Sequence, residues 1–86
     1  MTAFQASDYG SPAAQLINDL SYRLKRPSHR IQPFLRFRED LFLDIIDLKL
    51  LVADLEHRHG HFLTEEEAGR IETVGDLQQL FLRQMA

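Results

Sequence analysis

The segment from residue 44 to residue 60 constrains the fold most, because it predicts one long helix whose two ends are both marked. Asp44 suits the N-cap or the first turn, where an acidic side chain is favoured by the positive end of the helix dipole. Gly60 suits the position just after a helix, where the backbone often turns left-handed. His57, Arg58 and His59 place basic side chains near the negative end. We therefore predict a helix over residues 44–59.

A second helix is predicted near the start of the chain, after a polar stretch over residues 1–11 that we interpret as a flexible tail. Ser11 can act as the N-cap, and Pro12 suits the first turn because its missing N–H would be unsatisfied there in any case. Pro27 restricts the residue before it to extended conformations, so this helix should end near Arg26. Its apolar residues recur at three- and four-residue spacing, namely Leu16, Ile17, Leu20 and Leu24.

Two further helices are predicted in the last third of the chain. Thr64 and Glu67 have the spacing of a capping box and open a short helix that should run to about Arg70. Thr73 and Asp76 repeat the same spacing and open the last helix. The buried stripe of this last helix is expected to comprise Leu77, Leu80 and Phe81, with Met85.

Residues 28–40 form a long connection between the first two helices, and they carry bulky apolar residues that a solvated loop would not need. We expect these residues to fold back over the core: Ile31, Phe34, Leu35 and Phe37. No segment shows the alternation typical of a strand. The predicted fold class is therefore all-α, a small helical bundle of three longer helices and one short helix with a long first loop, over residues 12–86.

Composition limits the classes of function. A length of 86 residues suits one domain, and the absence of cysteine excludes disulfides and thiolate metal sites. The net charge of −3 argues against non-specific nucleic-acid binding, and no apolar run approaches the roughly 20 residues of a membrane span. The N-terminus lacks the basic and then apolar pattern of a signal peptide, so we predict a cytoplasmic protein.

Neither a metal site nor a catalytic centre is predicted. His57, His59 and His61 alternate, but residues two apart on a helix point about 200° apart and do not converge on one ion. Asp44 and Asp47 lie on one helical face, which is a common spacing and implies no acid/base chemistry. No ordering of Ser, His and Asp suggests a nucleophile, so we do not expect an enzyme.

The order and spacing of several motifs resemble the acyl carrier protein family. Residues 37–41 (Phe-Arg-Glu-Asp-Leu) resemble its Phe-x-Glu-Asp-Leu, and residues 51–56 (Leu-Val-Ala-Asp-Leu-Glu) resemble its Leu-Val-x-x-Leu-Glu. Residues 62–67 occupy its Ile-x-Ile-Pro-x-Glu-Glu segment without the proline, and residues 73–77 are close to its Thr-Val-Gly-Asp. The resemblance covers residues 13–85 and implies the carrier-protein fold.

The resemblance fails at the position that carries the family's chemistry. The family's central motif reads roughly Asp-Leu-Gly-x-Asp-Ser-Leu-Asp, and its serine is esterified to 4′-phosphopantetheine. Asp44 and Asp47 match the two later acids, whereas Ile45 stands at the serine position and Phe42 at the glycine. No serine or threonine lies within residues 29–63. The resemblance therefore implies the carrier's shape without its prosthetic group, and we predict no cofactor.

The predicted helix over residues 44–59 is apolar around most of its circumference, although a surface helix needs a stripe only a little over about 100° wide. The stripe expected to face the core is Ile46, Leu51, Val52 and Leu55. The remaining apolar side chains should then point partly outward, as interaction surfaces do, and complete the predicted partner-binding set Phe42, Leu43, Ile45, Leu48 and Leu50. For Ile45 an alternative stays open, that it is a core residue of a slightly rotated helix.

Basic residues gather ahead of this helix, namely Arg23, Lys25, Arg26, His29, Arg30, Arg36 and Arg38. They suit either a solvated face whose long side chains cover apolar surface, or a patch that meets an acidic partner or phosphate groups.

Together these features predict a docking, scaffold or regulatory partner of an enzyme of fatty-acid, polyketide or peptide assembly, bound through the helix that begins at Asp44. A self-associating module, such as a homodimer formed through the same helix, is the alternative. A true acyl carrier is a further one.

Overall fold

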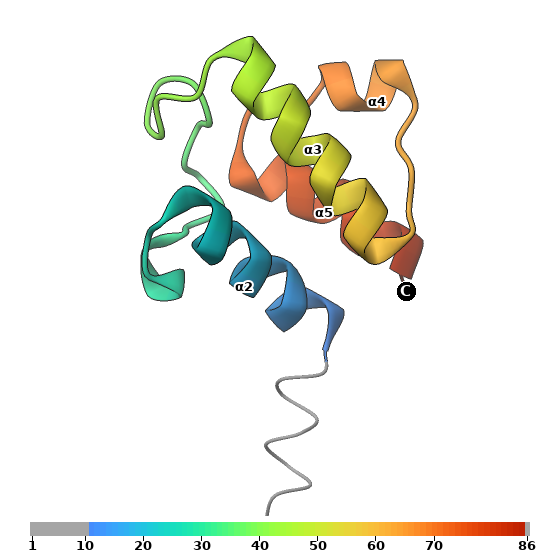
Figure 1. Ribbon diagram of the computed structural model, residues 1–86, viewed down its shortest axis with the longest axis horizontal. Helices are drawn as coiled ribbons and strands as arrows, with labels where there is room; N and C mark the ends of the chain where they lie inside the picture. The colour runs from blue at the N-terminus through green and yellow to red at the C-terminus, as the bar shows by residue number, and fades with distance from the viewer. Residues whose placement is uncertain (1–10, 86) are drawn as a thin grey trace, which may run out of the picture.

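The computed structural model describes residues 11–85, so the predicted tail over residues 1–11 lies outside the described part apart from Ser11. The described chain comprises α2 (Pro12–Leu24), the 3-10 turn η1 (Ser28–Arg30), α3 (Ile45–His59), α4 (Glu65–Gly69) and α5 (Val74–Met85). In Figure 1, α3 crosses in front of α5, α2 runs along one side of this pair, and α4 lies on the other side. The predicted all-α bundle of three longer helices, one short helix and a long first loop is confirmed.

Within the described residues, strand-like pairing is limited to one isolated antiparallel bridge between Arg36 and Thr73. None of the described helices is long and apolar enough to cross a membrane.

The helix ends follow their local sequence. Ser11 caps α2, and Thr64 and Glu67 form the predicted capping box of α4, with each side chain accepting the other's backbone N–H at 3.0 Å. Gly60 closes α3 in a left-handed conformation, with φ of 70°. Lys25 closes α2 in the same way, with φ of 56°, so the helix stops slightly before its predicted end.

One hydrophobic core joins α2, α3, α5 and the long connection. Its buried members are Leu16, Leu20, Ile31, Phe37, Leu41, Leu48, Leu51, Val52, Leu55, Ile71, Val74, Leu77 and Phe81. In the stripe predicted for α5, Leu77 and Phe81 are fully buried and Leu80 packs half-buried against the core. The side chain of Met85, which was expected to join them, lies outside the described part.

The long connection folds back over the core by docking on the start of α5. The backbone N–H of Val74 donates to the carbonyl of Leu35 at 2.9 Å, and that of Gly75 donates to the carbonyl of Pro33 at 2.8 Å. This contact favours glycine, because a Cβ on Gly75 would lie 3.1 Å from the Pro33 oxygen. The long connection therefore supplies acceptors for two of the N–H groups that a helix start leaves unsatisfied.

Three of the four apolar residues predicted to cover the core do so, and Phe34 does not. Ile31 and Phe37 are buried and Leu35 packs against the core, but Phe34 is 72% exposed. The carbonyls of Pro33 and Leu35 both point to α5, which leaves the residue between them on the outer side.

The histidines at the end of α3 make separate contacts. The Nε2 atom of His59 lies 2.8 Å from the Oδ2 atom of Asp19 and ties α3 to α2. The ring of His57 meets the ring of Phe62 edge-on, with centroids 5.7 Å apart. Among the described residues, no group of three His, Cys, Asp or Glu side chains is placed to hold a metal ion.

Candidate functional site

The start of α3 is a capping box open to solvent. The Oδ1 atom of Asp44 accepts the N–H of Asp47 at 2.8 Å, and the Oδ2 atom of Asp47 accepts the N–H of Asp44 at 3.4 Å. Ile45 is the first residue of the helix and is 50% exposed. The local sequence therefore sets up a helix start with a half-exposed apolar side chain at its first position.

The loop before α3 is tied together by its own hydrogen bonds. The N–H groups of Asp40 and Leu41 both donate to the carbonyl of Arg36, and the N–H of Leu43 donates to the carbonyl of Phe37. The N–H of Arg36 donates to the Asp40 carboxylate at 2.8 Å, which holds the pKa of Asp40 below its ordinary value of 3.8. A loop with this many internal bonds presents its outward side chains in defined positions.

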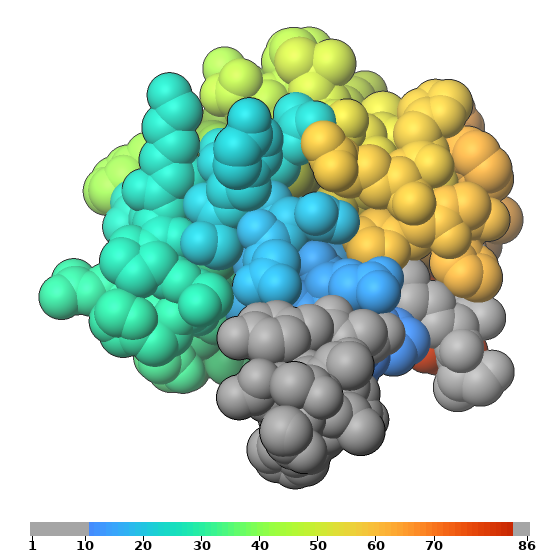
Figure 2. Space-filling model, turned by 60° about the horizontal axis from the view of Figure 1, so that its bottom comes forward, coloured from blue at the N-terminus to red at the C-terminus, as the bar shows by residue number. Residues whose placement is uncertain are grey.

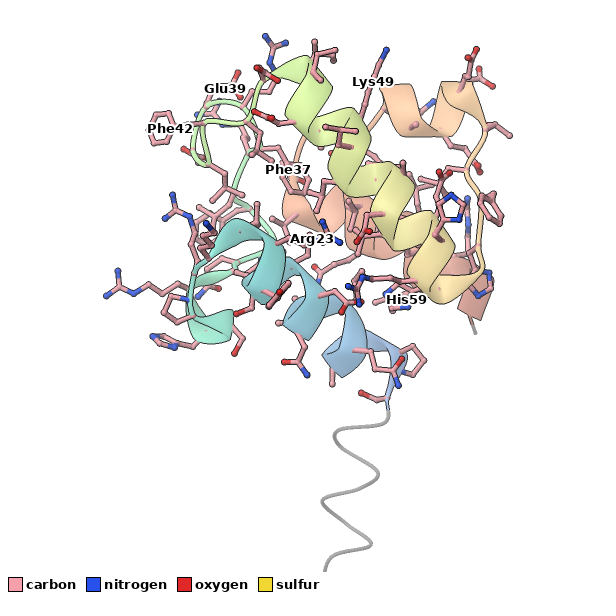
Figure 3. All side chains as sticks on the ribbon, viewed as in Figure 1. Arg23, Phe37, Glu39, Phe42, Lys49 and His59 are labelled. Atoms are coloured by element: carbon pink, nitrogen blue, oxygen red, sulfur yellow. The ribbon has the colours of Figure 1, made fainter. Side chains whose placement is uncertain are left out.

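Phe42 stands at the tip of this loop in a left-handed conformation. Its φ is 60°, which is unusual for a bulky residue, and its side chain is 79% exposed. Figure 3 shows Phe42 pointing away from the bundle, with Glu39 on the same loop, whereas Phe37 points into the bundle. The loop thus holds one phenylalanine in the core and offers the other to solvent.

The side of α3 that faces the core differs from the predicted one. The buried residues are Leu48, Leu51, Val52 and Leu55, which recur at the i, i+3, i+4, i+7 spacing of a single helical face. Ile46 lies roughly 180° around the helix from the mean direction of these four and is 58% exposed. The expectations that Ile46 faces the core and that Leu48 points outward are therefore wrong.

Four exposed apolar residues at the start of α3 define the outer face: Phe42, Ile45, Ile46 and Leu50. Of the predicted partner-binding set, Phe42, Ile45 and Leu50 belong to this face, with Leu50 64% exposed. Leu43 packs half-buried against the core, and Leu48 is buried. Ile46 was missed, although the buried spacing of the helix already places it on the outer side.

Three hollows border the outer face. The first is lined by Leu43, Leu50 and Arg23, so it joins the outer face to α2. The second is lined by Ile45, Arg38, Glu39 and residues between α4 and α5, including Glu72. The third lies between α3 and α4 and is lined by Ile45, Leu48 and Ala68. Arginine side chains therefore lie beside the outer face in two of the three hollows, each with an acidic side chain in the same hollow.

The two carboxylates at this site cap the start of α3. Asp44 and Asp47 are engaged in each other's backbone hydrogen bonds, and the side chains around them are mainly apolar. The arrangement is suited to contact with another surface, because exposed apolar groups clustered at a rigid helix start favour burial.

The comparisons with known proteins point to one family. No protein-family model matches the chain. The chain is similar to the acyl carrier protein MbtL of Mycolicibacterium paratuberculosis, with 38% identity over 73 residues, which covers 80% of this chain and 82% of that protein. Together with the helical bundle described above, this similarity shows that the chain belongs to the acyl carrier protein family.

Proposed function

We propose that this chain is a family member that carries no phosphopantetheine and acts as a docking, scaffold or regulatory partner of enzymes of fatty-acid, polyketide or peptide biosynthesis. The outer face at the start of α3 is the contact surface, and the protein acts in the cytoplasm.

The observation that carries the proposal is the chemistry available at the start of α3. Attachment of phosphopantetheine as a phosphodiester needs a hydroxyl oxygen, and the resemblance places that oxygen directly after Asp44. Ile45 stands there, and residues 29–63 contain no Ser, Thr or Tyr. The helix start keeps the cap that would orient such a group, but its first side chain is a hydrocarbon.

The outer face supports a contact role because its exposure costs free energy in the isolated chain. Burial of two side chains of this size against a partner contributes roughly 3–5 kcal/mol. Phe42 adds a second argument, since a left-handed conformation costs an L-residue about 1–2 kcal/mol relative to glycine. A residue that is strained and exposed gives the isolated fold little, whereas it gives a docked complex a large aromatic contact.

The absence of a carrier function is tested by intact-mass measurement. The purified chain is incubated with coenzyme A and a broad-specificity phosphopantetheinyl transferase, beside an ordinary acyl carrier protein as the positive control. We expect the mass to stay unchanged. The Ile45→Ser variant restores a hydroxyl directly after Asp44. It tests whether the start of α3 can still be modified with phosphopantetheine. A gain of one phosphopantetheine by the unaltered chain would refute the proposal.

The docking role is tested with a matched pair of substitutions. Leu50 and Phe62 are almost equally exposed, at 64% and 62%, but only Leu50 lies on the outer face. A panel of purified acyl-activating and condensing enzymes is titrated with each variant. We expect Leu50→Asp to weaken binding at least about tenfold and Phe62→Asp to leave it within about twofold, as for a central and a remote residue. Equal effects of the two variants would contradict docking through the outer face.

Self-association through the same face is separated by sedimentation. A dimer that Leu50→Asp dissociates, with no binding to any of these enzymes, would replace the proposed function by the self-associating alternative.

A further inference from the structure

The charge of this chain is divided unevenly along its length. Residues 20–38, here called the basic segment, hold six of the ten Lys and Arg residues and contain no Asp or Glu. The segment runs from the last turns of α2 through η1 into the long connection. A chain with a net charge of −3 therefore has one continuous stretch that is strongly positive.

Most of this positive charge is not neutralised within the fold. Arg23 pairs with Asp54 on α3, and Arg36 pairs with Asp40. The other four cations are exposed and form no ion pair with another described residue: Lys25, Arg26, Arg30 and Arg38.

The basic segment lies beside the outer face. Arg23 lines one hollow together with Leu50 and Asp47, and Arg38 lines another together with Ile45 and Glu39. Figure 2 shows the same relation on the surface, where the teal part of the chain borders the yellow-green part at the start of α3. A partner that covers the outer face therefore also meets Arg23 and Arg38, the first and last cations of the basic segment.

The basic segment and the outer face each contain one residue in a left-handed backbone conformation. Among the described residues, Lys25 and Phe42 are the two non-glycine residues with positive φ, at 56° and 60°. Lys25 occupies the position after α2 where glycine is favoured, and its turn is closed by the N–H of Arg26 donating to Ser21. Lys25 thus places a charged side chain on the surface, and Phe42 places an aromatic ring there.

We propose that the partner surface is apolar opposite the outer face and acidic opposite the basic segment. This inference rests on the proposed function and adds the charge of the partner. Opposed like charges at an interface margin are repulsive, and complementary ones speed association and set orientation. The exposed acids Glu39, Asp44 and Asp47 lie near the same helix start, so a uniformly anionic lipid surface fits this face poorly. A protein can place its acids opposite the basic segment alone.

The test uses probes of defined charge. Two synthetic amphipathic helices share a leucine face, and their polar faces carry glutamate in one and lysine in the other. Their binding to the full chain is followed by fluorescence anisotropy. We expect the glutamate helix to bind at least about tenfold more tightly, and its affinity to fall as salt rises from about 0.05 to about 0.3 M. Equal or tighter binding of the lysine helix, or no binding of either helix, would overturn the inference.

Matched charge reversals locate the effect. Arg26→Glu with Arg30→Glu lies in the basic segment, and Arg70→Glu with Arg83→Glu changes the net charge equally on α4 and α5. We expect the first pair to weaken binding of the glutamate helix about tenfold. The second pair should weaken this binding about twofold or less, since exposed ion pairs are individually weak. Replacement of the first pair by Gln should give an intermediate loss. An equal loss from both pairs would contradict a local role.

Two further measurements separate the possible failures. If Leu50→Asp removes binding of both helices but the charge reversals change nothing, docking through the outer face stands and the acidic partner is refuted. If Leu50→Asp has no effect, the outer face itself is refuted. Flotation with phosphatidylcholine vesicles containing phosphatidylserine tests whether the chain binds an anionic membrane. Vesicle binding that needs Arg26 and Arg30, without binding of the glutamate helix, would replace the acidic protein by a membrane.

Discussion

The starts of α3 and α5 have the same pattern of capping hydrogen bonds, but the first is exposed to solvent and the second is buried. At each start the capping residue accepts an N–H from the residue three positions later, and an acid at that later position accepts backbone N–H groups in return. At α5 the first residue, Val74, is fully buried under the long connection. At α3 the first residue, Ile45, is half exposed beside the exposed Phe42.

The difference shows that capping a helix start and burying it under another segment, here called its cover, are independent. The cap satisfies backbone groups within one turn, whatever lies outside the helix. The cover at α5 comes from residues about 40 positions earlier, whose carbonyls at Pro33 and Leu35 accept two N–H groups of the helix. No described segment supplies the equivalent cover at α3, so the apolar residues there are available to a partner.

The largest expected effect compares the same substitution at the two helices. Leu77 in α5 is fully buried, and Leu50 in α3 is 64% exposed. We expect Leu77→Ala to lower the free energy of unfolding by about 2–5 kcal/mol, through lost burial and a residual cavity. Leu50→Ala should change it by less than about 0.5 kcal/mol. Urea titration measures both, and similar losses would show that the two environments are not opposite.

A smaller effect is expected where the long connection touches α5. A Cβ on Gly75 would lie 3.1 Å from the Pro33 oxygen, whereas a Cβ on Gly69 meets no atom within 4 Å. Gly75→Ala should therefore destabilise the chain by about 1 kcal/mol, since the cover must shift. Gly69→Ala should stabilise it by about 0.5 kcal/mol or less, because Gly69 is the last residue of α4 and alanine is favoured over glycine in a helical conformation. Thermal unfolding gives the two signs directly, and a stabilising Gly75→Ala would mean that the cover is loose.

The cap of α5 should also be visible in the pH dependence of stability. The N–H groups of Glu72 and Thr73 donate to the Asp76 carboxylate at 3.0 Å, and these bonds hold its pKa below the ordinary 3.8. A lowered pKa contributes stability that is present above about 3.8 and is lost as pH falls through the folded-state value. Asp76→Asn should reduce the fall in the free energy of unfolding as pH drops below about 3.8. At neutral pH the same substitution should lower the free energy of unfolding by less than about 1 kcal/mol. An unchanged profile would argue against this cap.

A further small effect on stability is expected at Phe42, and it is stabilising. Phe42→Gly removes the left-handed strain and should raise the free energy of unfolding by about 0.5–1 kcal/mol, because the greater freedom of glycine when unfolded offsets part of the gain. The same substitution should weaken docking, since it removes the most exposed ring of the outer face. A variant that is more stable and binds less well would separate the roles of the two helix starts. Undiminished binding would remove Phe42 from the contact surface.

Particular residues show how far sequence reasoning reaches in this fold. The start of α3 at Asp44, the capping box at Thr64 and the stop at Gly60 were all predicted, because each depends on hydrogen bonds that span a few residues. The core side of α3 was predicted wrongly, although the spacing of Leu48 with its buried neighbours was present in the sequence. The helix is apolar on nearly every side, so its own pattern does not single out one face.

The sequence by itself determined the four described α-helices, most of their ends and the missing hydroxyl at the start of α3, since these follow from residue chemistry and local backbone geometry. Only the tertiary structure decided that Ile46 and Phe34 face solvent and that the basic segment borders the outer face. Those outcomes depend on how the long connection docks on α5 and how α3 rotates against its neighbours. Both are contacts between residues far apart in the chain, where local propensity exerts no control.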